Sequence, residues 1–188
     1  MKTSIRENRM VNWPDKKYKT IYADPPWPEC GAGKVKRGAD KHYPLMTLEE
    51  ISYLPVAKLA EDSCHLYLWT TNNYLPAAVE TIRVWGFRYI TCITWAKPTI
   101  GIGQYFRGQT EHCLFATRGA ALPYKEKNGK RQQGRTLLMP GQLFESSRSH
   151  SSKPNEMRKM IEIVSHPPFI ELFARYKTKG WDTWGNEV

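Results

Sequence analysis

Several features that define other classes of protein are absent from this sequence. The four cysteines are widely separated and form no C-x-x-C pair, and no histidine stands at zinc-finger spacing. No stretch approaches the roughly 20 apolar residues of a membrane span, and residues 1–9 contain no apolar signal segment. We therefore expect a soluble, cytoplasmic protein. Its thiols should be free or buried, with no metal site and no membrane contact.

A phosphate-binding loop for nucleoside triphosphates is also missing. The segment Gly31-Ala-Gly-Lys34 contains glycines and a lysine, but the G-x-x-x-x-G-K-[ST] spacing is absent. Val35 stands where the magnesium-binding hydroxyl would be. This segment is therefore not expected to bind a triphosphate.

Positive charge is what the sequence has in excess. Its 188 residues include 28 Lys and Arg against 18 Asp and Glu, a formal net charge of +10. Clustered basic side chains release counterions when they neutralise phosphates, so the composition favours a nucleic-acid partner without separating DNA from RNA. With 40% hydrophobic residues the chain can bury one sizeable core, and a single domain over residues 1–188 is expected.

Apolar runs alternate with helical patterns along most of the chain. Strands are predicted at residues 18–23, 63–71, 87–95, 111–117, 136–139, 142–145 and 169–175, and helices at 47–60, 74–85 and 153–165. The first helix opens on the capping box Thr47-Leu-Glu-Glu50 and is expected to break at Pro55. This alternation predicts an α/β fold with a mostly parallel sheet flanked by helices. Residues 96–150 have little helical pattern and are a candidate substrate-facing insertion.

The tetrapeptide Asp24-Pro25-Pro26-Trp27 directly follows the first predicted strand. Open α/β sheets bind ligands at the carboxyl ends of their strands, so these four residues are candidate catalytic residues. The Asp24 carboxylate and the rigid Pro25 carbonyl could each accept a hydrogen bond from an amine on an aromatic base. The Trp27 ring could stack on that base, a contact worth about 1 to 3 kcal/mol in single-stranded nucleic-acid sites. An ordinary turn is the alternative, because Asp and Pro are common turn formers.

Further motifs follow in order along the chain. They are Tyr43-Pro-x-Met46-Thr47, Leu66-Tyr-Leu-Trp69, Thr94-Trp-Ala-Lys97, Glu111-His-Cys-Leu114, Arg148 through Ser152-Lys-Pro154, Glu171-Leu-Phe-Ala-Arg175 and Gly180-Trp-Asp-x-Trp-Gly-Asn-Glu187. With the DPPW tetrapeptide, this set resembles the DPPW-type adenine-N6 methyltransferases, which include bacterial and phage DNA enzymes and the catalytic subunit of the eukaryotic mRNA adenosine methyltransferase. The resemblance implies a Rossmann-like methyltransferase fold in which the catalytic motif precedes the cofactor motif.

The resemblance also implies S-adenosyl-L-methionine as the cofactor. The residues expected at the cofactor are Asp24, Lys153, Glu171, Arg175, Asn186 and Glu187. By resemblance, Lys153 approaches the methionine carboxylate and Arg175 the ribose, while Asn186 and Glu187 contact the adenosine. The last two are almost at the end of the chain, so their role requires the tail to be docked by Trp181 and Trp184.

The chain departs from the family after its last predicted strand. Phe173-Ala-Arg-Tyr-Lys177 has none of the glycines of an F-x-G-x-G cofactor loop, and Lys177-Thr178 stands where eukaryotic relatives have a His-Asn pair. Close backbone approach to the cofactor and the ribose contact are therefore the parts of the site in which this chain is expected to differ.

The implied substrate is an adenine that is flipped out of a duplex or already single-stranded. Tyr43 and Trp27 are expected at its ring. Phosphate contacts are expected from basic residues of two loops and from one further arginine, although charge runs are often only solvated loops. These residues are Lys34, Lys36, Arg37, Lys125, Lys127, Lys130, Arg131, Arg135 and Arg148.

Site-specific methylation of the N6 amine of adenine in DNA is the favoured function, because a small, basic chain looks more like the bacterial and phage DNA enzymes. Methylation of adenine in RNA is the nearest alternative. Cytosine-N4 and protein-glutamine methylation more often accompany Ser-Pro-Pro-Tyr and Asn-Pro-Pro-Tyr. A catalytically inactive nucleic-acid-binding relative is an alternative of another class. The recognised sequence, a protein partner and the oligomeric state stay open.

Overall fold

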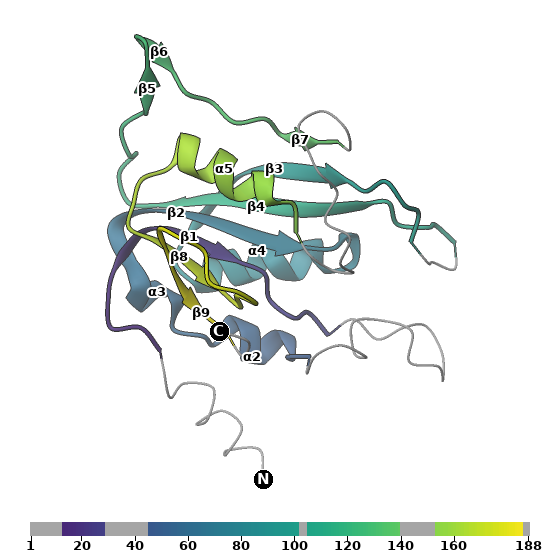
Figure 1. Cartoon of the computed structure of the whole chain (residues 1–188). Coiled ribbons are helices and arrows are strands. Elements are labelled where there is room, and N and C mark those ends of the chain that lie inside the picture. Colours follow the sequence, from purple (N-terminus) through teal and green to yellow (C-terminus); the bar gives the residue numbers. More distant parts are fainter. Residues whose placement is uncertain (1–12, 29–44, 102–104, 140–152, 186–188) are drawn as a thin grey trace.

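A computed structural model describes residues 13–28, 45–101, 105–139 and 153–185 of the chain. Their centre is a seven-stranded sheet with the order β7-β3-β4-β2-β1-β8-β9 (Figure 1). The strands are β1 (Tyr18–Ala23), β2 (Ala60–Thr70), β3 (Arg88–Ala96), β4 (Thr110–Arg118), β7 (Leu137–Leu138), β8 (Phe169–Leu172) and β9 (Trp181–Trp184).

The sheet is parallel except at β4. β1 pairs in parallel with β2 on one side and with β8 on the other, while β4 runs antiparallel to both β2 and β3. The strand order reverses beside β1, because the chain passes from β1 to β2 on one side and returns later to β8 on the other, and α/β sheets form their ligand crevices at such a switch. The prediction of a mostly parallel α/β sheet is thus confirmed, and β1 lies at this switch.

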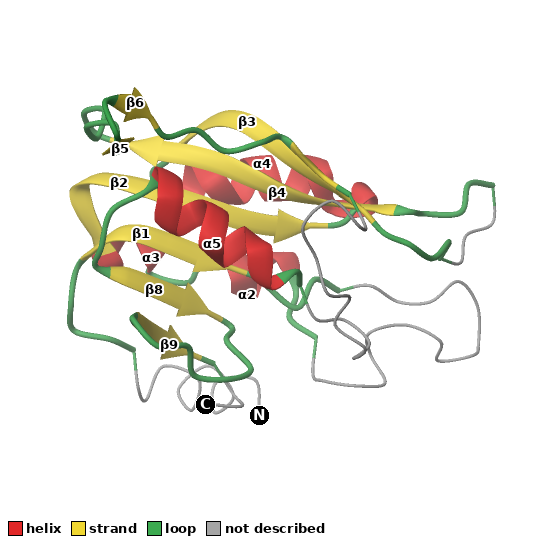
Figure 2. Cartoon of the chain, turned by 45° about the horizontal axis from the view of Figure 1, so that its top comes forward, coloured by secondary structure: helices red, strands yellow, loops and turns green. Residues whose placement is uncertain are grey.

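Helices cover both faces of the sheet (Figure 2). One face carries α2 (Leu48–Ser52), α3 (Val56–Leu59) and α4 (Leu75–Val84), and the other carries α5 (Asn155–Val164). The period of two along the strands explains the two layers. On β2, Leu66 and Leu68 belong to the core cluster under α2 to α4, whereas Tyr67 and Trp69 belong to the cluster under α5.

Most predicted elements are present, with shifted boundaries. The helix predicted at 47–60 is divided at Pro55 into α2 and α3, and its capping box forms, with the Glu50 amide donating to Thr47 Oγ1. The last predicted strand is wrong beyond Leu172, because Phe173 takes a φ of 64° and turns the chain. The strand predicted at 142–145 lies outside the described residues.

A small hairpin was not predicted from the sequence. β5 (Glu126–Lys127) and β6 (Lys130–Arg131) pair around Asn128 and Gly129, which have φ values of 53° and 69°. An Asn-Gly pair is the strongest short-range hairpin signal, because both residues tolerate positive φ in a two-residue turn. The charge of the flanking residues concealed this signal, since an apolar alternation was absent.

No helix among these described residues is both long and apolar enough to cross a membrane.

Two glycines with positive φ allow a matched test of how closely the backbone packs just after β4. Gly119 and Gly129 have φ values of 68° and 69°, but a Cβ at Gly119 would lie 1.9 Å from the Asp62 carbonyl, whereas nothing lies within 4 Å of one at Gly129. We expect Gly129→Ala to lower the free energy of unfolding by about 1 to 2 kcal/mol, the backbone cost alone. Gly119→Ala should cost at least about 2 kcal/mol more, because the Asp62 backbone must move. Urea unfolding measures both, and equal losses would contradict this packing.

Candidate active site at the carboxyl ends of β1 and β8

The DPPW turn begins where β1 ends. The Asp24 amide donates to the Leu172 carbonyl at the end of β8, over 3.4 Å, so Asp24 lies between two parallel strand ends. Inside the turn, the Trp27 amide donates to the Pro25 carbonyl and the Met46 amide donates to the Pro26 carbonyl. A carbonyl oxygen has two lone pairs, so Pro25 keeps acceptor capacity for a ligand.

Trp27 holds this turn from inside. It is 5% exposed, its Nε1 donates to the Trp69 carbonyl over 2.8 Å, and its ring stacks on Tyr74 with a centroid distance of 5.9 Å. A base could stack on this ring only if the ring left its packed position. Burying the indole under the strand ends removes apolar area from water, and stacking of Trp27 on a base stays a prediction.

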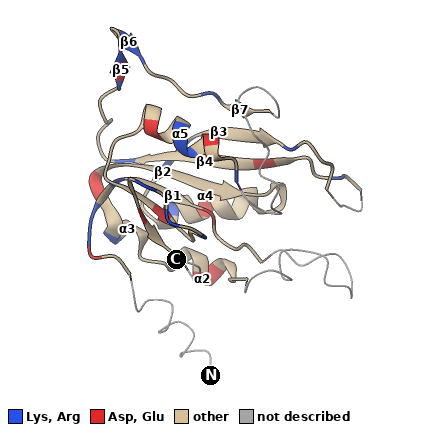
Figure 3. Cartoon of the chain, in the orientation of Figure 1, with Lys and Arg blue, Asp and Glu red and all other residues tan. Residues whose placement is uncertain are grey.

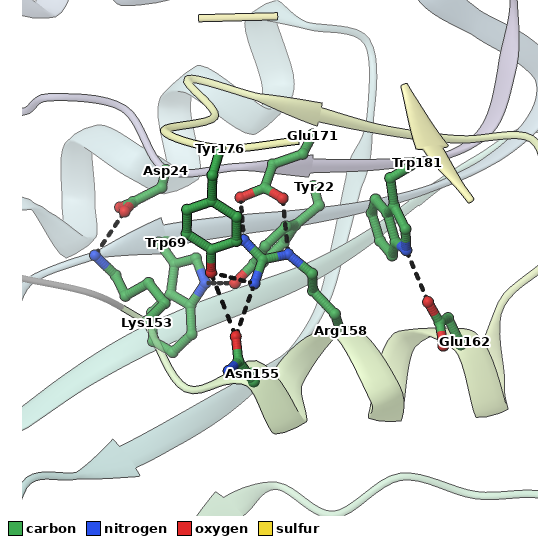
Figure 4. A network of polar contacts seen from close by, with 10 residues as sticks. All are labelled: Tyr22, Asp24, Trp69, Lys153, Asn155, Arg158, Glu162, Glu171, Tyr176 and Trp181. Atoms are coloured by element: carbon green, nitrogen blue, oxygen red, sulfur yellow. Dashed lines mark hydrogen bonds and ion pairs between the residues drawn. The ribbon is translucent and has the colours of Figure 1, made fainter. Parts of the chain in front are cut away.

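A chain of alternating charges runs from Asp24 across the strand ends. Lys153 Nζ, just before α5, lies 2.8 Å from Asp24 Oδ2 and 3.3 Å from Glu111 Oε2 (Figure 4 shows the contact with Asp24). The other Glu111 oxygen lies 2.5 Å from Lys97 Nζ at the end of β3. The network ties the ends of β1, β3 and β4 to the start of α5.

Glu111 is a charged residue that sequence reasoning did not choose for the site. Burial acts to raise its pKa, but the ammonium groups of Lys153 and Lys97 outweigh burial and hold the pKa below its ordinary value of 4.5. The signal was available, because Glu111 is the single acidic residue of the stretch that became β4. Its partners come from other elements, so its role depends on the tertiary fold.

Lys153 also has an aromatic neighbour. Its Nζ lies 5.4 Å from the centre of the Trp69 ring, within the range of a cation–π contact. Trp69 is fixed in turn by a 2.6 Å hydrogen bond from its Nε1 to the Tyr22 hydroxyl. The lysine predicted at the cofactor is thus held beside Asp24 by an aromatic and two carboxylates, with its side chain 14% exposed.

Glu171, predicted at the cofactor, has its carboxylate paired with an arginine. Its side chain pairs with Arg158 of α5 through two bonds, Nε to Oε2 at 2.7 Å and Nη2 to Oε1 at 2.6 Å (Figure 4). Arg158 also donates to the Tyr176 hydroxyl and to Asn155. A buried carboxylate needs such a partner, and the bidentate pair joins α5 to β8 instead of reaching a ligand.

The tail is docked, as predicted, through residue 185. Trp181 and Trp184 are buried on β9, and the Ala174 amide donates to the Trp184 carbonyl. A Cβ at Gly185 would lie 2.3 Å from the Ala174 carbonyl, so the backbones approach closely there. Arg175 is half-buried in the segment between β8 and β9. Asn186 and Glu187, predicted at the adenosine, lie outside the described residues.

The predicted phosphate contacts divide into two groups. Five predicted substrate contacts lie outside the described residues: Lys34, Lys36, Arg37, Tyr43 and Arg148. The others belong to the β5–β6 hairpin and its flanks. Figure 3 shows this basic hairpin at the end of the sheet where the parallel strands begin. Asp24 lies at the opposite end, where those strands finish.

Contacts of the hairpin explain its place. Lys125 Nζ donates to the Glu162 and Ser165 carbonyls, so it caps the carboxyl end of α5. Arg131 stacks on Tyr124 with its guanidinium carbon 3.2 Å from the ring centre, and Lys127, Lys130 and Arg135 are exposed. These residues are therefore not brought together with Asp24, and Lys125 has a structural contact.

The described residues contain no group of three or more His, Cys, Asp and Glu side chains arranged to hold a metal ion. The site is therefore described by its carboxylates, its lysines and the backbone carbonyls of the DPPW turn.

Comparison with known proteins identifies relatives across nearly the whole chain. The MT-A70 family model matches residues 18–187. The chain is 32% identical over 198 residues to the type II methyltransferase M.MunI of a Mycoplasma species, covering 93% of this chain and 79% of that protein. It is 32% identical to the N6-methyladenosine RNA methyltransferase MTA1 of Cryphonectria parasitica, covering 89% of this chain and 51% of that protein. Identity to the human N(6)-adenosine-methyltransferase catalytic subunit METTL3 is 28%, covering 92% of this chain and 28% of the relative.

The lowered pKa of Glu111 gives a prediction for stability against pH. A carboxylate whose pKa is depressed by folding stabilises the protein above its unfolded pKa, and this contribution is lost as the pH falls through the folded pKa. Relative to Glu111→Gln, the native protein should therefore lose stability as the pH falls below about 4.5, the ordinary value. Urea unfolding between pH 3 and pH 7, the range about that value, measures the difference in free energy.

The matched control is Glu80→Gln. Glu80 forms an ion pair with Arg83 on α4, and both side chains are more than half exposed, at 60% and 73%. Exposed pairs contribute only about 0 to 1 kcal/mol, so this variant should follow the native pH dependence closely. Parallel pH curves for the native protein and Glu111→Gln would show that the lysines do not stabilise the Glu111 carboxylate.

Proposed function

Since the chain belongs to the MT-A70 family, we propose that it transfers a methyl group from S-adenosylmethionine to the N6 amine of adenine in DNA, at specific sites. The observation that carries the proposal is the pairing of Asp24 with Lys153 at the carboxyl ends of β1 and β8, at 2.8 Å. Both residues belong to the motif set that resembles this family. They lie where a Rossmann-like sheet binds its ligands.

The side chains at this edge fit the cofactor that MT-A70 methyltransferases use. S-Adenosylmethionine supplies an electrophilic methyl group on its sulfonium when it is bound. Its methionine part carries a carboxylate, and the Lys153 ammonium is the cation at the strand ends that would pair with it. The Glu171 carboxylate is taken by Arg158, so the ribose is proposed to meet Arg175 and the backbone after β8, with Asn186 and Glu187 toward the adenosine.

Asp24 would orient the amine of the substrate. Its Oδ2 accepts from Lys153, and Oδ1 is the oxygen proposed to accept one N–H of the adenine amine. The Pro25 carbonyl would accept the other N–H with its second lone pair. Both acceptors draw the nitrogen lone pair out of the ring and aim it at the methyl donor, so positioning carries much of the acceleration.

The ion pair with Lys153 orients the Asp24 side chain as a hydrogen-bond acceptor. An acceptor suffices, because the amine nitrogen becomes acidic only while it is being alkylated, and its proton can then pass to Asp24 or to water. Trp27 is proposed to act through the turn, by fixing the positions of Asp24 and Pro25, rather than by stacking on the base.

DNA is the proposed substrate because the similarity to the Mycoplasma type II methyltransferase extends over 79% of that protein. RNA is the alternative, supported by the relatives named as RNA or adenosine methyltransferases, of which this chain spans about half or less. The excess of 28 basic over 18 acidic residues supports either polyanion. An inactive nucleic-acid-binding relative is less favoured, since the Asp24 and Lys153 side chains are intact and in contact. We place the reaction in the cytoplasm.

Labelled S-adenosylmethionine, offered with unmethylated DNA and with RNA, tests this proposal. N6-methyldeoxyadenosine, identified by mass spectrometry of the digested nucleosides, is the expected product. Asp24→Asn should lower kcat by about 100-fold or more, the scale of losing one oriented polar group at a reaction centre. Lys153→Met should chiefly raise the Kd for S-adenosylmethionine, measured by calorimetry.

Asp182→Asn is the matched carboxylate control. Asp182 of β9 accepts hydrogen bonds from Lys16, before β1, and from Tyr18, at the start of β1, away from the DPPW turn, so its variant should keep native kcat. Label found only in RNA would make the DNA assignment wrong. Full activity of Asp24→Asn would make the role of Asp24 wrong, and salt-dependent DNA binding without S-adenosylmethionine binding would favour the inactive relative.

A further inference from the structure

The connection between β3 and β4 forms an arm beyond the sheet. The Lys97 amide donates to the Gln109 carbonyl over 2.8 Å, and the Gly101 amide donates to the Gly108 carbonyl over 2.7 Å. The two sides are close, since a Cβ at Gly101 would lie 2.8 Å from the Gly108 oxygen. Residues 97–101 and 105–109 thus lie side by side beyond the ends of β3 and β4, as a paired extension called the arm below (Figure 1).

Two aromatic side chains on the arm are almost fully in water. Tyr105 is 91% exposed and Phe106 is 92% exposed, while Tyr53, the next most exposed of the described large hydrophobic residues, is 70% exposed. Leaving a side chain of this size in water forgoes about 1.5 to 3 kcal/mol of burial. Adjacent aromatics with this exposure indicate a surface that is covered by a partner.

A basic side chain follows the aromatic pair. Arg107 is exposed, and its Nε donates to the Gly101 carbonyl across the arm over 2.9 Å. This bond uses one of the five N–H donors of the guanidinium and fixes its orientation. The described part of the arm contains Lys97 and Arg107 and no acidic residue, so its charge matches a phosphate backbone.

The arm leaves the sheet at the same end of the strands as the DPPW turn. Lys97 at its base pairs with Glu111, which pairs with Lys153, which pairs with Asp24. From β3 and β4 to β1 there are two to three strand spacings, about 10 to 15 Å. That distance corresponds to about three or four base-pair steps of DNA. A duplex that delivers a base to Asp24 would therefore pass the arm.

We propose that Tyr105 and Phe106 form a stacking wedge that enters the DNA base stack close to the target adenine, with Arg107 on an adjacent phosphate. The wedge rests on the proposed methylation of DNA and extends it to how a paired adenine reaches Asp24. Aromatic and apolar side chains inserted between base steps unstack them, and stacking on an aromatic ring offsets part of that cost. The exposed pair is a surface of the right chemistry for this, whereas the buried Trp27 is not.

The test compares paired with unpaired adenine. The variant Tyr105→Ala/Phe106→Ala should lower kcat/KM roughly tenfold or more on a duplex with a paired target, and change it less than about threefold on the same strand when single, because an unpaired base needs no extrusion. Phe106→Trp should keep native activity on both. Tyr53→Ala, which removes an exposed aromatic next to α2, is the matched control and should leave both rates unchanged.

A binding measurement tests the wedge independently of methyl transfer. Fluorescence anisotropy compares an intact duplex with a duplex lacking one base. The native protein should bind the duplex that lacks one base more tightly than the intact duplex. The double variant should lose this preference while its unfolding midpoint stays native. If the native protein methylates no DNA but shows this preference, the proposed function fails and the wedge stands.

Three results would overturn the wedge. One is an equal loss of activity of the double variant on paired and single-stranded targets. Another is a double variant with native activity and a native preference for the duplex that lacks one base. The third is a double variant that changes the oligomeric state in sedimentation while its DNA binding stays native. That third result would assign the aromatic pair to a protein interface.

Discussion

The Lys153–Asp24 ion pair is the contact on which the arrangement of the site depends. Asp24 comes from the end of β1 and Lys153 from the start of α5, elements separated by most of the chain. A half-buried carboxylate without this partner would bear the cost of its desolvation, and so would a half-buried ammonium. The pair therefore links the position of α5 to the position of the Asp24 carboxylate in the DPPW turn. Glu111 extends the same link to β4, and through Lys97 to the arm.

α5 carries two basic residues with different tasks. Arg158 is committed to Glu171 by a bidentate pair with both side chains less than a tenth exposed, which fixes the helix against β8. Lys153, in front of the helix, has its ammonium at the strand ends. The Glu171 carboxylate, expected at the cofactor, instead fixes α5 to the sheet. The same helix begins just after Lys153, whose ammonium is the cation proposed to pair with the cofactor. Arginine suits the anchor, because its planar fork matches a carboxylate, and lysine suits the ligand side as a compact, adaptable charge.

Much of this arrangement could be predicted from the sequence, and what could not be predicted depends on contacts between distant elements. Periodicity and capping located β1, β2, α4 and α5, because those signals are local. The end of β8 was misplaced, since Phe173 turns the chain without a glycine. DPPW and Lys153 were recognised as parts of an ordered motif set, but no local pattern reveals that Trp27 is packed under Tyr74 or that Glu171 faces Arg158. Burial decides both, and burial is a property of the assembled sheet.

The described basic residues lie at both ends of the parallel strands. Five basic residues lie on the β5–β6 hairpin and its flanks, at the end of the sheet where the parallel strands begin, and one of them, Lys125, caps α5. The arm has only two basic residues in its described part. It lies at the same end of the strands as Asp24, however, and exposes Tyr105 and Phe106. Phosphate contacts position a strand, but a base must also leave the stack, and contacts with the bases favour that step directly. Exposed aromatic side chains at the carboxyl ends of the parallel strands therefore bear more directly on the proposed chemistry than a larger positive charge at the opposite end of the sheet.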